Sequence, residues 1–251
     1  EGGKMLGQST TSASNIVQFI KEANNNPLVK VILLEINSPG GSAVASDEIA
    51  TAVKKSQKPV VTLIREVGAS GGYWVASASD YIIANRMSIT GSIGVISSYL
   101  EFSGLMNQYG VSYERLVAGE HKDLGTPLKK LDDNEKEILQ KKLDTIHDFF
   151  ILSVAENRNL PEDKIRMLAT GEFYLGVEAL KLNLIDELGD KNTAESYLQR
   201  KYDLKEVEYI TYRQPVGFFD IFSGVFSEFF FSAGQGFGSM VLQRQNNILN
   251  V

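Results

Sequence analysis

An apolar strand pattern that runs into a glycine-flanked serine constrains this chain more than any other stretch. Residues 60–64 read V-V-T-L-I, and residues 68–72 read G-A-S-G-G. The first run predicts a buried strand, and the small apolar residues of 71–79 predict a helix. A serine at such a turn exposes its hydroxyl beside the free N–H groups of the helix start. Ser70 is therefore a candidate nucleophile, and the alternative is that it only caps the helix.

The rest of the chain alternates between helix and strand patterns, which predicts an α/β fold with parallel strands and crossover helices. Helices are predicted at 14–23, 43–55, 71–79, 100–109, 132–157, 162–170, 176–182 and 193–202. Strands are predicted at 29–36, 60–64, 81–84, 112–117, 184–186 and 207–212. Because no repeat or linker interrupts them, residues 1–212 are expected to form one domain, followed by a Phe-rich tail at 213–251.

One helical face of that tail carries Phe219, Phe222, Phe226 and Phe230. Such a face is expected to pack on this protein or on a second copy, and contact with a membrane surface is the alternative. The apolar part of the tail is interrupted by acidic residues and is shorter than the roughly 20 residues of a spanning helix.

Composition excludes several classes of function. The chain has 31 acidic and 25 basic residues, a net charge of −6 and no basic stripe, so no nucleic-acid partner is expected. It has no cysteine, which excludes disulfides, thiolate catalysis and cysteine-ligated zinc. Neither a metal nor another cofactor is expected.

A serine nucleophile needs a general base, and few residues qualify. His147 falls in an apolar-periodic helix, where a structural role is expected. His121 and Lys122 lie in a polar loop punctuated by glycines, and either could serve. A lysine base must be neutral, and burial can lower a lysine pKa from about 10.4 by about 3–5 units. The alternative for Lys122 is an ordinary solvated charge.

Five motifs then point to a family. They are I-N-S-P-G-G at 36–41, G-A-S-G-G-Y at 68–73, T-G-S-I-G-V at 90–95, G-E-H-K-D-L-G-T-P at 119–127 and A-L-K-L-N-L-I-D-E-L-G at 179–189. In order and approximate spacing they resemble the signal peptide peptidase A family, the Ser-Lys proteases of the ClpP/crotonase-like fold. The chain is similar to the short, single-copy form of the family, which assembles as a ring.

The resemblance implies a role for each matching residue. Ser70 takes the position of the nucleophile, Lys122 that of the general base, and Ser92 that of the hydroxyl that orients the lysine amine. Backbone N–H groups of Gly41 and Gly71 take the positions of the oxyanion hole, a contribution of about 3–4 kcal/mol per donor. Gly40 is a possible substitute for Gly41, since the two glycines are adjacent.

The resemblance also implies a substrate and a location. The expected substrates are membrane-associated remnant signal peptides and other apolar peptides, cleaved by a homo-oligomeric ring. The family's N-terminal single-pass membrane anchor is expected to precede this sequence, which would place the catalytic domain on the extracytoplasmic side of the cell membrane.

Three other functions compete with this prediction. A ClpP-like protease shares the motif at 36–41 but needs a Ser-His-Asp triad, and no histidine lies between Ser70 and His121. A crotonase-type acyl-CoA enzyme needs acidic groups that form no recognisable pair here. A membrane-associated oligomeric scaffold that binds apolar segments would need neither Ser70 nor Lys122. The sequence therefore predicts a Ser-Lys protease.

Overall fold

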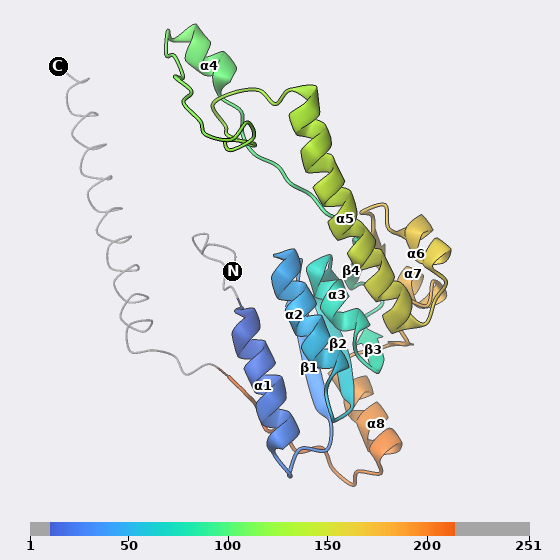
Figure 1. Ribbon diagram of the computed structural model, residues 1–251. Helices are drawn as coiled ribbons and strands as arrows, with labels where there is room; N and C mark the ends of the chain where they lie inside the picture. The colour runs from blue at the N-terminus through green and yellow to red at the C-terminus, as the bar shows by residue number, and fades with distance from the viewer. Residues whose placement is uncertain (1–10, 214–251) are drawn as a thin grey trace, which may run out of the picture. The chain divides into compact units, whose positions relative to one another are not determined.

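The computed structural model describes residues 11–213. The chain divides into two compact units, Glu1–Tyr209 and Ile210–Val251, of which the second is described only over 210–213. The Phe-rich tail and its predicted helical face therefore lie outside the described residues. In the first unit, helices lie on both faces of a twisted sheet (Figure 1).

The order of the helices agrees with the prediction, while the strands differ in part. The helices are α1 (Ala13–Asn25), α2 (Ala43–Lys54), α3 (Gly71–Ser77), α4 (Ser103–Gln108), α5 (Asp133–Arg158), α6 (Glu162–Leu168), α7 (Gly176–Lys181) and α8 (Lys191–Tyr202). The strands are β1 (Ile32–Ser38), β2 (Val60–Ala69), β3 (Tyr81–Ala84), β4 (Ile89–Gly91), β5 (Phe173–Leu175) and β6 (Glu187–Leu188). No helix among residues 11–213 has the length and apolar composition needed to cross a bilayer.

The sheet is built around β2. Its strands run in the order β5-β4-β2-β3-β6, with β1 also paired to β2. Every pairing is parallel except that of β4 with β5. The first half of β2 pairs with β3 and the second half with β4, whose register joins Ala69 to Gly91. This mostly parallel, curled sheet confirms the predicted α/β class and is consistent with a ClpP/crotonase-like fold.

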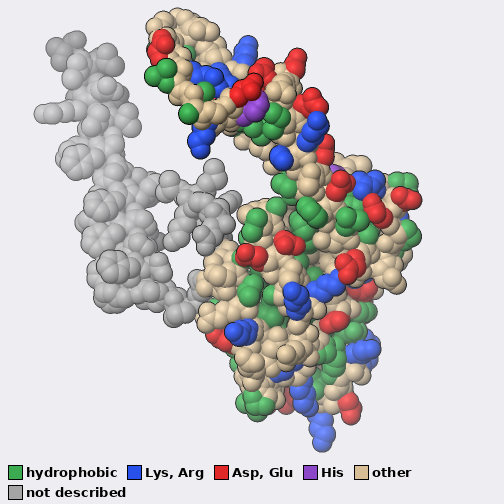
Figure 2. Space-filling model, viewed as in Figure 1, with side chains coloured by type: hydrophobic (Ala, Val, Ile, Leu, Met, Phe, Trp, Pro, Cys, Tyr) green, Lys and Arg blue, Asp and Glu red, His purple; other side chains and the backbone are tan. Residues whose placement is uncertain are grey.

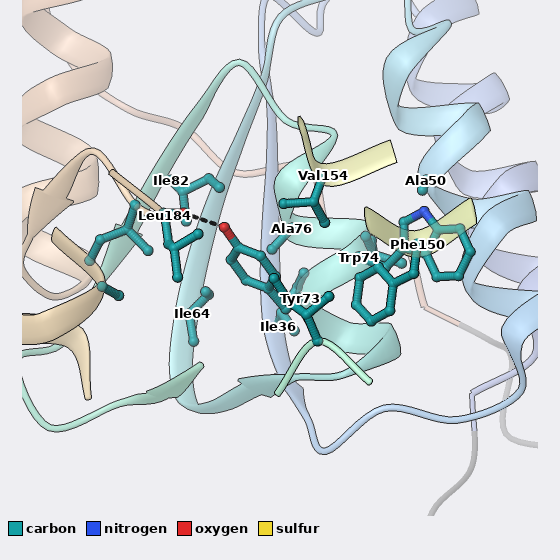
Figure 3. Close-up of a cluster of buried hydrophobic side chains, with 14 of the residues drawn as sticks. Ile36, Ala50, Ile64, Tyr73, Trp74, Ala76, Ile82, Phe150, Val154 and Leu184 are labelled. Atoms are coloured by element: carbon teal, nitrogen blue, oxygen red, sulfur yellow. Dashed lines mark hydrogen bonds between the residues drawn. The ribbon is translucent and has the colours of Figure 1, made fainter. Parts of the chain in front are cut away.

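Side chains of β2 alternate between two hydrophobic cores, as the pleat of a strand requires. Val60 and Ile64 belong to the larger core, while Val61 and Leu63 belong to the core under α8. In the larger core the Tyr73 hydroxyl donates to the carbonyl of Leu184 at 2.8 Å (Figure 3). The rings of Trp74 and Phe150 stack beside it with centroids 4.6 Å apart. Helix α3 is thus fixed from both sides, by a hydrogen bond and by ring stacking.

Predicted strands at 112–117 and 207–212 are wrong, because the structure has no strand at either place. The sequence also did not predict β4 or β5. The strand predicted at 184–186 is displaced, because the ladder with β3 begins at Glu187. A short apolar run becomes a strand only when a neighbouring strand supplies hydrogen-bond partners, and local sequence does not contain that information.

Residues 96–131, here called the arm, differ from the rest of the first unit. The arm contains α4 and lies at the N-terminal end of α5, away from α3 and the sheet (Figure 1). None of its residues is buried, and Leu116 is 97% exposed. The arm includes the predicted loop with His121 and Lys122, so the candidate base lies outside the packed body.

Candidate active site

Ser70 lies between the last residue of β2 and the first residue of α3. Its backbone has φ 50° and ψ −125°, a conformation that non-glycine residues rarely adopt and that costs about 1–3 kcal/mol. The Ser70 amide donates to the Gly91 carbonyl at 2.8 Å, and the Trp74 amide donates to the Ser70 carbonyl at 2.9 Å. A strained serine at a strand-to-helix turn is the arrangement of a nucleophile elbow. The alternative of a simple cap finds no support, because the Ser70 side chain makes no capping hydrogen bond.

The glycine loop after β1 packs directly against this turn. A Cβ atom placed on Gly40 would lie 2.8 Å from Ser70 Cβ and 2.9 Å from the Gly71 nitrogen. Gly40 also has φ +114°, a conformation that a side chain would strain. A Cβ on Gly71 would lie 3.3 Å from the Gly41 nitrogen. The structure therefore brings Gly40, Gly41, Ser70 and Gly71 together although about thirty residues separate the two motifs.

Two backbone N–H groups at this junction are candidate donors to an oxyanion. The Gly40 amide already donates to Ser38 Oγ at 3.2 Å. In residues 11–213, neither the Gly41 amide nor the Gly71 amide has a hydrogen-bond acceptor. A Cβ placed on Gly41 would have no atom within 4 Å, so that side of the loop is open. Because the Gly40 amide is already hydrogen-bonded and the Gly41 amide is not, Gly41 is the better candidate for the second donor beside Gly71.

Ser92 follows Gly91, whose carbonyl accepts from Ser70. It too has φ 50°, and its hydroxyl donates to the Gly171 carbonyl at 3.2 Å. The Ser92 amide donates to the Glu172 carbonyl at 2.9 Å. Ser92 is thus held beside the nucleophile turn by the segment that precedes β5.

The structure shows two contacts near the site that the sequence did not predict. Ser46 of α2 is buried, and a Cβ on Gly71 would lie 2.2 Å from its Oγ. The Nε2 atom of His147 in α5 lies 3.3 Å from the carbonyl oxygen of Ile93, the residue after Ser92. No motif marks either contact, since both join elements that are distant in sequence.

Lys122 is exposed in the arm, in a turn where its amide donates to the Gly119 carbonyl at 3.1 Å. Within residues 11–213, no hydrogen bond joins Lys122 to Ser70 or Ser92. His121 is also exposed and has no hydrogen bond to Ser70 in the same range. A single copy of the described chain therefore brings together the candidate nucleophile and the candidate oxyanion donors but not the candidate base.

Comparison with known proteins gives a family that agrees with this site. The model of peptidase family S49 matches residues 52–205. "Putative protease MJ0651" of Methanocaldococcus jannaschii is 34% identical over 214 residues, which cover 84% of this chain and 69% of that protein. "Putative signal peptide peptidase SppA" of Enterococcus faecium is 35% identical over 202 residues, with 79% and 59% covered.

"Protease 4" of Haemophilus influenzae is 33% identical over 202 residues, which cover 77% of this chain and 32% of that protein. The chain thus spans between about one third and about two thirds of the length of these relatives. The family match includes the turn between β2 and α3 with Ser70, the residue after β4, Ser92, and the arm with Lys122. The chain belongs to peptidase family S49, the family of the SppA proteases.

Proposed function

We propose that this chain is a serine endopeptidase that uses Ser70 and Lys122 to hydrolyse apolar peptides such as remnant signal peptides. The observation that carries the proposal is the junction of Ser70 with the unoccupied N–H groups of Gly41 and Gly71. Attack by Ser70 Oγ on a peptide carbonyl places negative charge on the carbonyl oxygen. Two preorganised N–H donors stabilise that charge, at about 3–4 kcal/mol each.

Lys122 supplies the proton chemistry in this proposal. Its neutral amine accepts the Ser70 hydroxyl proton during attack and then donates a proton to the leaving peptide amine. The Ser92 hydroxyl hydrogen-bonds the lysine amine and orients it. Water then attacks the acyl-enzyme, the same lysine accepts the water proton, and Ser70 regains its hydrogen.

The exposed arm indicates how the base reaches the serine. Ile96, Leu100 and Leu116 are 82%, 74% and 97% exposed, so the arm presents apolar side chains that a partner could cover. We place Lys122 of one copy beside Ser70 of a second copy, in a homo-oligomeric ring. The family resemblance supports the ring, and it also supports a membrane location through an N-terminal anchor.

The test uses three substitutions and one mixture. Ser70→Ala and Lys122→Ala are expected to abolish hydrolysis of an apolar peptide while the fold and the oligomer persist, because nucleophile and base act as a unit. His121→Ala should retain most of the activity. Coassembly of Ser70→Ala chains with Lys122→Ala chains should restore activity, since some junctions then receive a serine from one chain and a lysine from the other.

Contrary outcomes are equally specific. An inactive His121→Ala with an active Lys122→Ala would assign the base to the histidine. A wild-type chain that binds apolar peptides but neither cleaves them nor reacts at Ser70 with a fluorophosphonate would favour the scaffold function. If both single variants are inactive and their mixture does not regain activity, the lysine base and the serine must belong to the same chain.

A further inference from the structure

Four charged side chains lie in and around the loop that carries Lys122, three of them in the arm and one at the start of α5. They are Arg115, Asp123, Lys129 and Glu135, here called the arm cluster. Basic and acidic side chains are visible side by side on this part of the surface (Figure 2). None of the four has a part in the proposed chemistry, so their arrangement needs a separate explanation.

Arg115 holds the chain on both sides of Lys122. Its Nε and Nη2 atoms donate to the two carboxylate oxygens of Asp123 at 2.7 and 2.8 Å. The same Nη2 donates to the carbonyl of Glu120 at 2.6 Å. One guanidinium thus fixes the second residue before the lysine and the first residue after it. A planar guanidinium suits this task, because its donors are rigid relative to one another.

Lys129 and Glu135 connect that loop to α5. Lys129 Nζ lies 2.5 Å from Glu135 Oε1 and 3.8 Å from Asp123 Oδ1. Glu135 is only 2% exposed, and its other oxygen accepts from the Asp132 amide at 3.2 Å. The Glu135 amide in turn donates to Asp132 Oδ1 at 2.8 Å, which completes a capping box. The lysine loop is therefore anchored to the first turn of a 26-residue helix.

The loop has little else to define its shape. Gly119 and Gly125 bracket Lys122 at φ +99° and +81°, with no neighbouring atom within 4 Å of a Cβ at either position. Turn hydrogen bonds join the Lys122 amide to Gly119 and the Leu124 amide to His121. An apolar core does not hold this loop, because no arm residue is buried. Polar contacts must therefore supply its conformation.

We propose that the arm cluster positions Lys122 for the reaction, with Arg115 and Asp123 as the residues that fix the lysine backbone. The inference rests on the proposed function, because it assumes that Lys122 is the base. The four residues act through Lys122 and do not touch the substrate. Single exposed ion pairs contribute little, but this cluster joins a bidentate Arg–Asp pair to a buried glutamate at a helix start. The cluster also explains why a base could lie on an exposed arm without losing its alignment.

The test compares Asp123→Asn and Arg115→Gln with wild type on an apolar peptide. Each change should lower kcat by about 10- to 100-fold, the scale expected when a catalytic group is misplaced by roughly 1 Å. KM should stay within about two-fold of the wild-type value, because the variants leave the residues around Ser70 that bind the substrate unchanged. The double variant should be no slower than the slower single variant, since both changes break the same contact. Hydrogen exchange of residues 119–125 should become faster in each variant.

A matched control removes another Arg–Asp pair that involves α5. Asp148 accepts from Arg166 at 2.8 Å and lies in the helix itself. Asp148→Asn should keep kcat within about two-fold of wild type, because its pair does not contact the lysine loop. Light scattering on every variant reports whether the oligomer persists.

Three results would overturn the inference. The first is wild-type kcat in both Asp123→Asn and Arg115→Gln while Lys122→Ala is inactive, which leaves the proposed function standing. The second is an equal loss in Asp148→Asn. The third is dissociation of the oligomer or loss of the fold in parallel with activity, which would assign the cluster to assembly or stability. Full activity of Lys122→Ala would instead refute the proposed function itself.

Discussion

The turn that carries Ser70 and the arm that carries Lys122 are held by opposite means. Ser70 adjoins a helix that is wholly buried, and the glycine loop after β1 lies so close to Ser70 that it leaves no room for a side chain at Gly40. The arm has no buried residue and relies on ion pairs and turn hydrogen bonds. The candidate nucleophile thus belongs to the packed core, while the candidate base lies on an exposed segment that a partner can still adjust. A site divided in this way can be completed by assembly.

The largest difference between the two regions should appear in stability. Phe150→Ala removes a buried ring that stacks on Trp74, and such truncations cost about 3–5 kcal/mol. Leu116→Ala, at a side chain that is 97% exposed, should stay within about 0.5 kcal/mol in the dissociated chain. Urea unfolding of both variants measures the contrast. Equal losses would show that the arm is folded into a core of its own.

Two glycines with positive φ offer a smaller and more local contrast. Gly40→Ala strains the backbone and forces a Cβ against Ser70 and the Gly71 nitrogen, so it should destabilise by about 1–3 kcal/mol and abolish hydrolysis. Gly110→Ala in the arm has φ +69° and open space around the new atom, so only the backbone strain applies. Thermal unfolding and peptide hydrolysis check both. An active Gly40→Ala would disprove the close packing at the oxyanion site.

The smallest expected effect is a shift in one carboxyl titration. The hydrogen bond from Arg115, with Lys129 nearby, lowers the pKa of Asp123 to about 2. A carboxyl whose folded pKa lies below its unfolded value of about 3.9 stabilises the fold above that value. That contribution is lost as the pH falls through about 2. Carboxyl NMR should show this low midpoint in wild type, and Arg115→Gln should move it toward 3.9. A wild-type midpoint near 4 would mean that the Arg115 contact does not form in solution.

Much of the first unit outside the arm could be predicted from the sequence. Helix α1, helix α2 and strand β3 agree with the predictions to within two residues, because amphipathic spacing and β-branched runs reflect local preferences. Strand β2 was predicted to end at Ile64, since Arg65 and Glu66 interrupt the apolar run. The structure extends it to Ala69 through pairing with β4. The extension depends on a partner about twenty residues away, which local propensity does not reveal.

The candidate functional residues likewise fall into two groups, those identified from the sequence and those that only the structure revealed. The strand-to-helix pattern singled out Ser70 as a candidate nucleophile, with a helix cap as the alternative. The family resemblance implied roles for Gly41, Gly71, Ser92 and Lys122. The roles of all five residues remain predictions. Sequence reasoning missed the contacts made by Ser46, by His147 and within the arm cluster. Each of these contacts involves a residue outside the five motifs, and the contact itself exists only once the chain has folded.

By itself, the sequence determined the α/β class, the body's main helices and the serine turn, since these follow from residue preferences over short stretches. Only the tertiary structure decided that Gly40 lies against Ser70 and that, within residues 11–213, the amides of Gly41 and Gly71 have no hydrogen-bond acceptor. It also decided that Lys122 lies on an exposed arm rather than beside the serine. The physical reason is that packing and hydrogen-bond occupancy depend on distances between segments, and those distances are fixed by the sheet and its cores and not by local sequence.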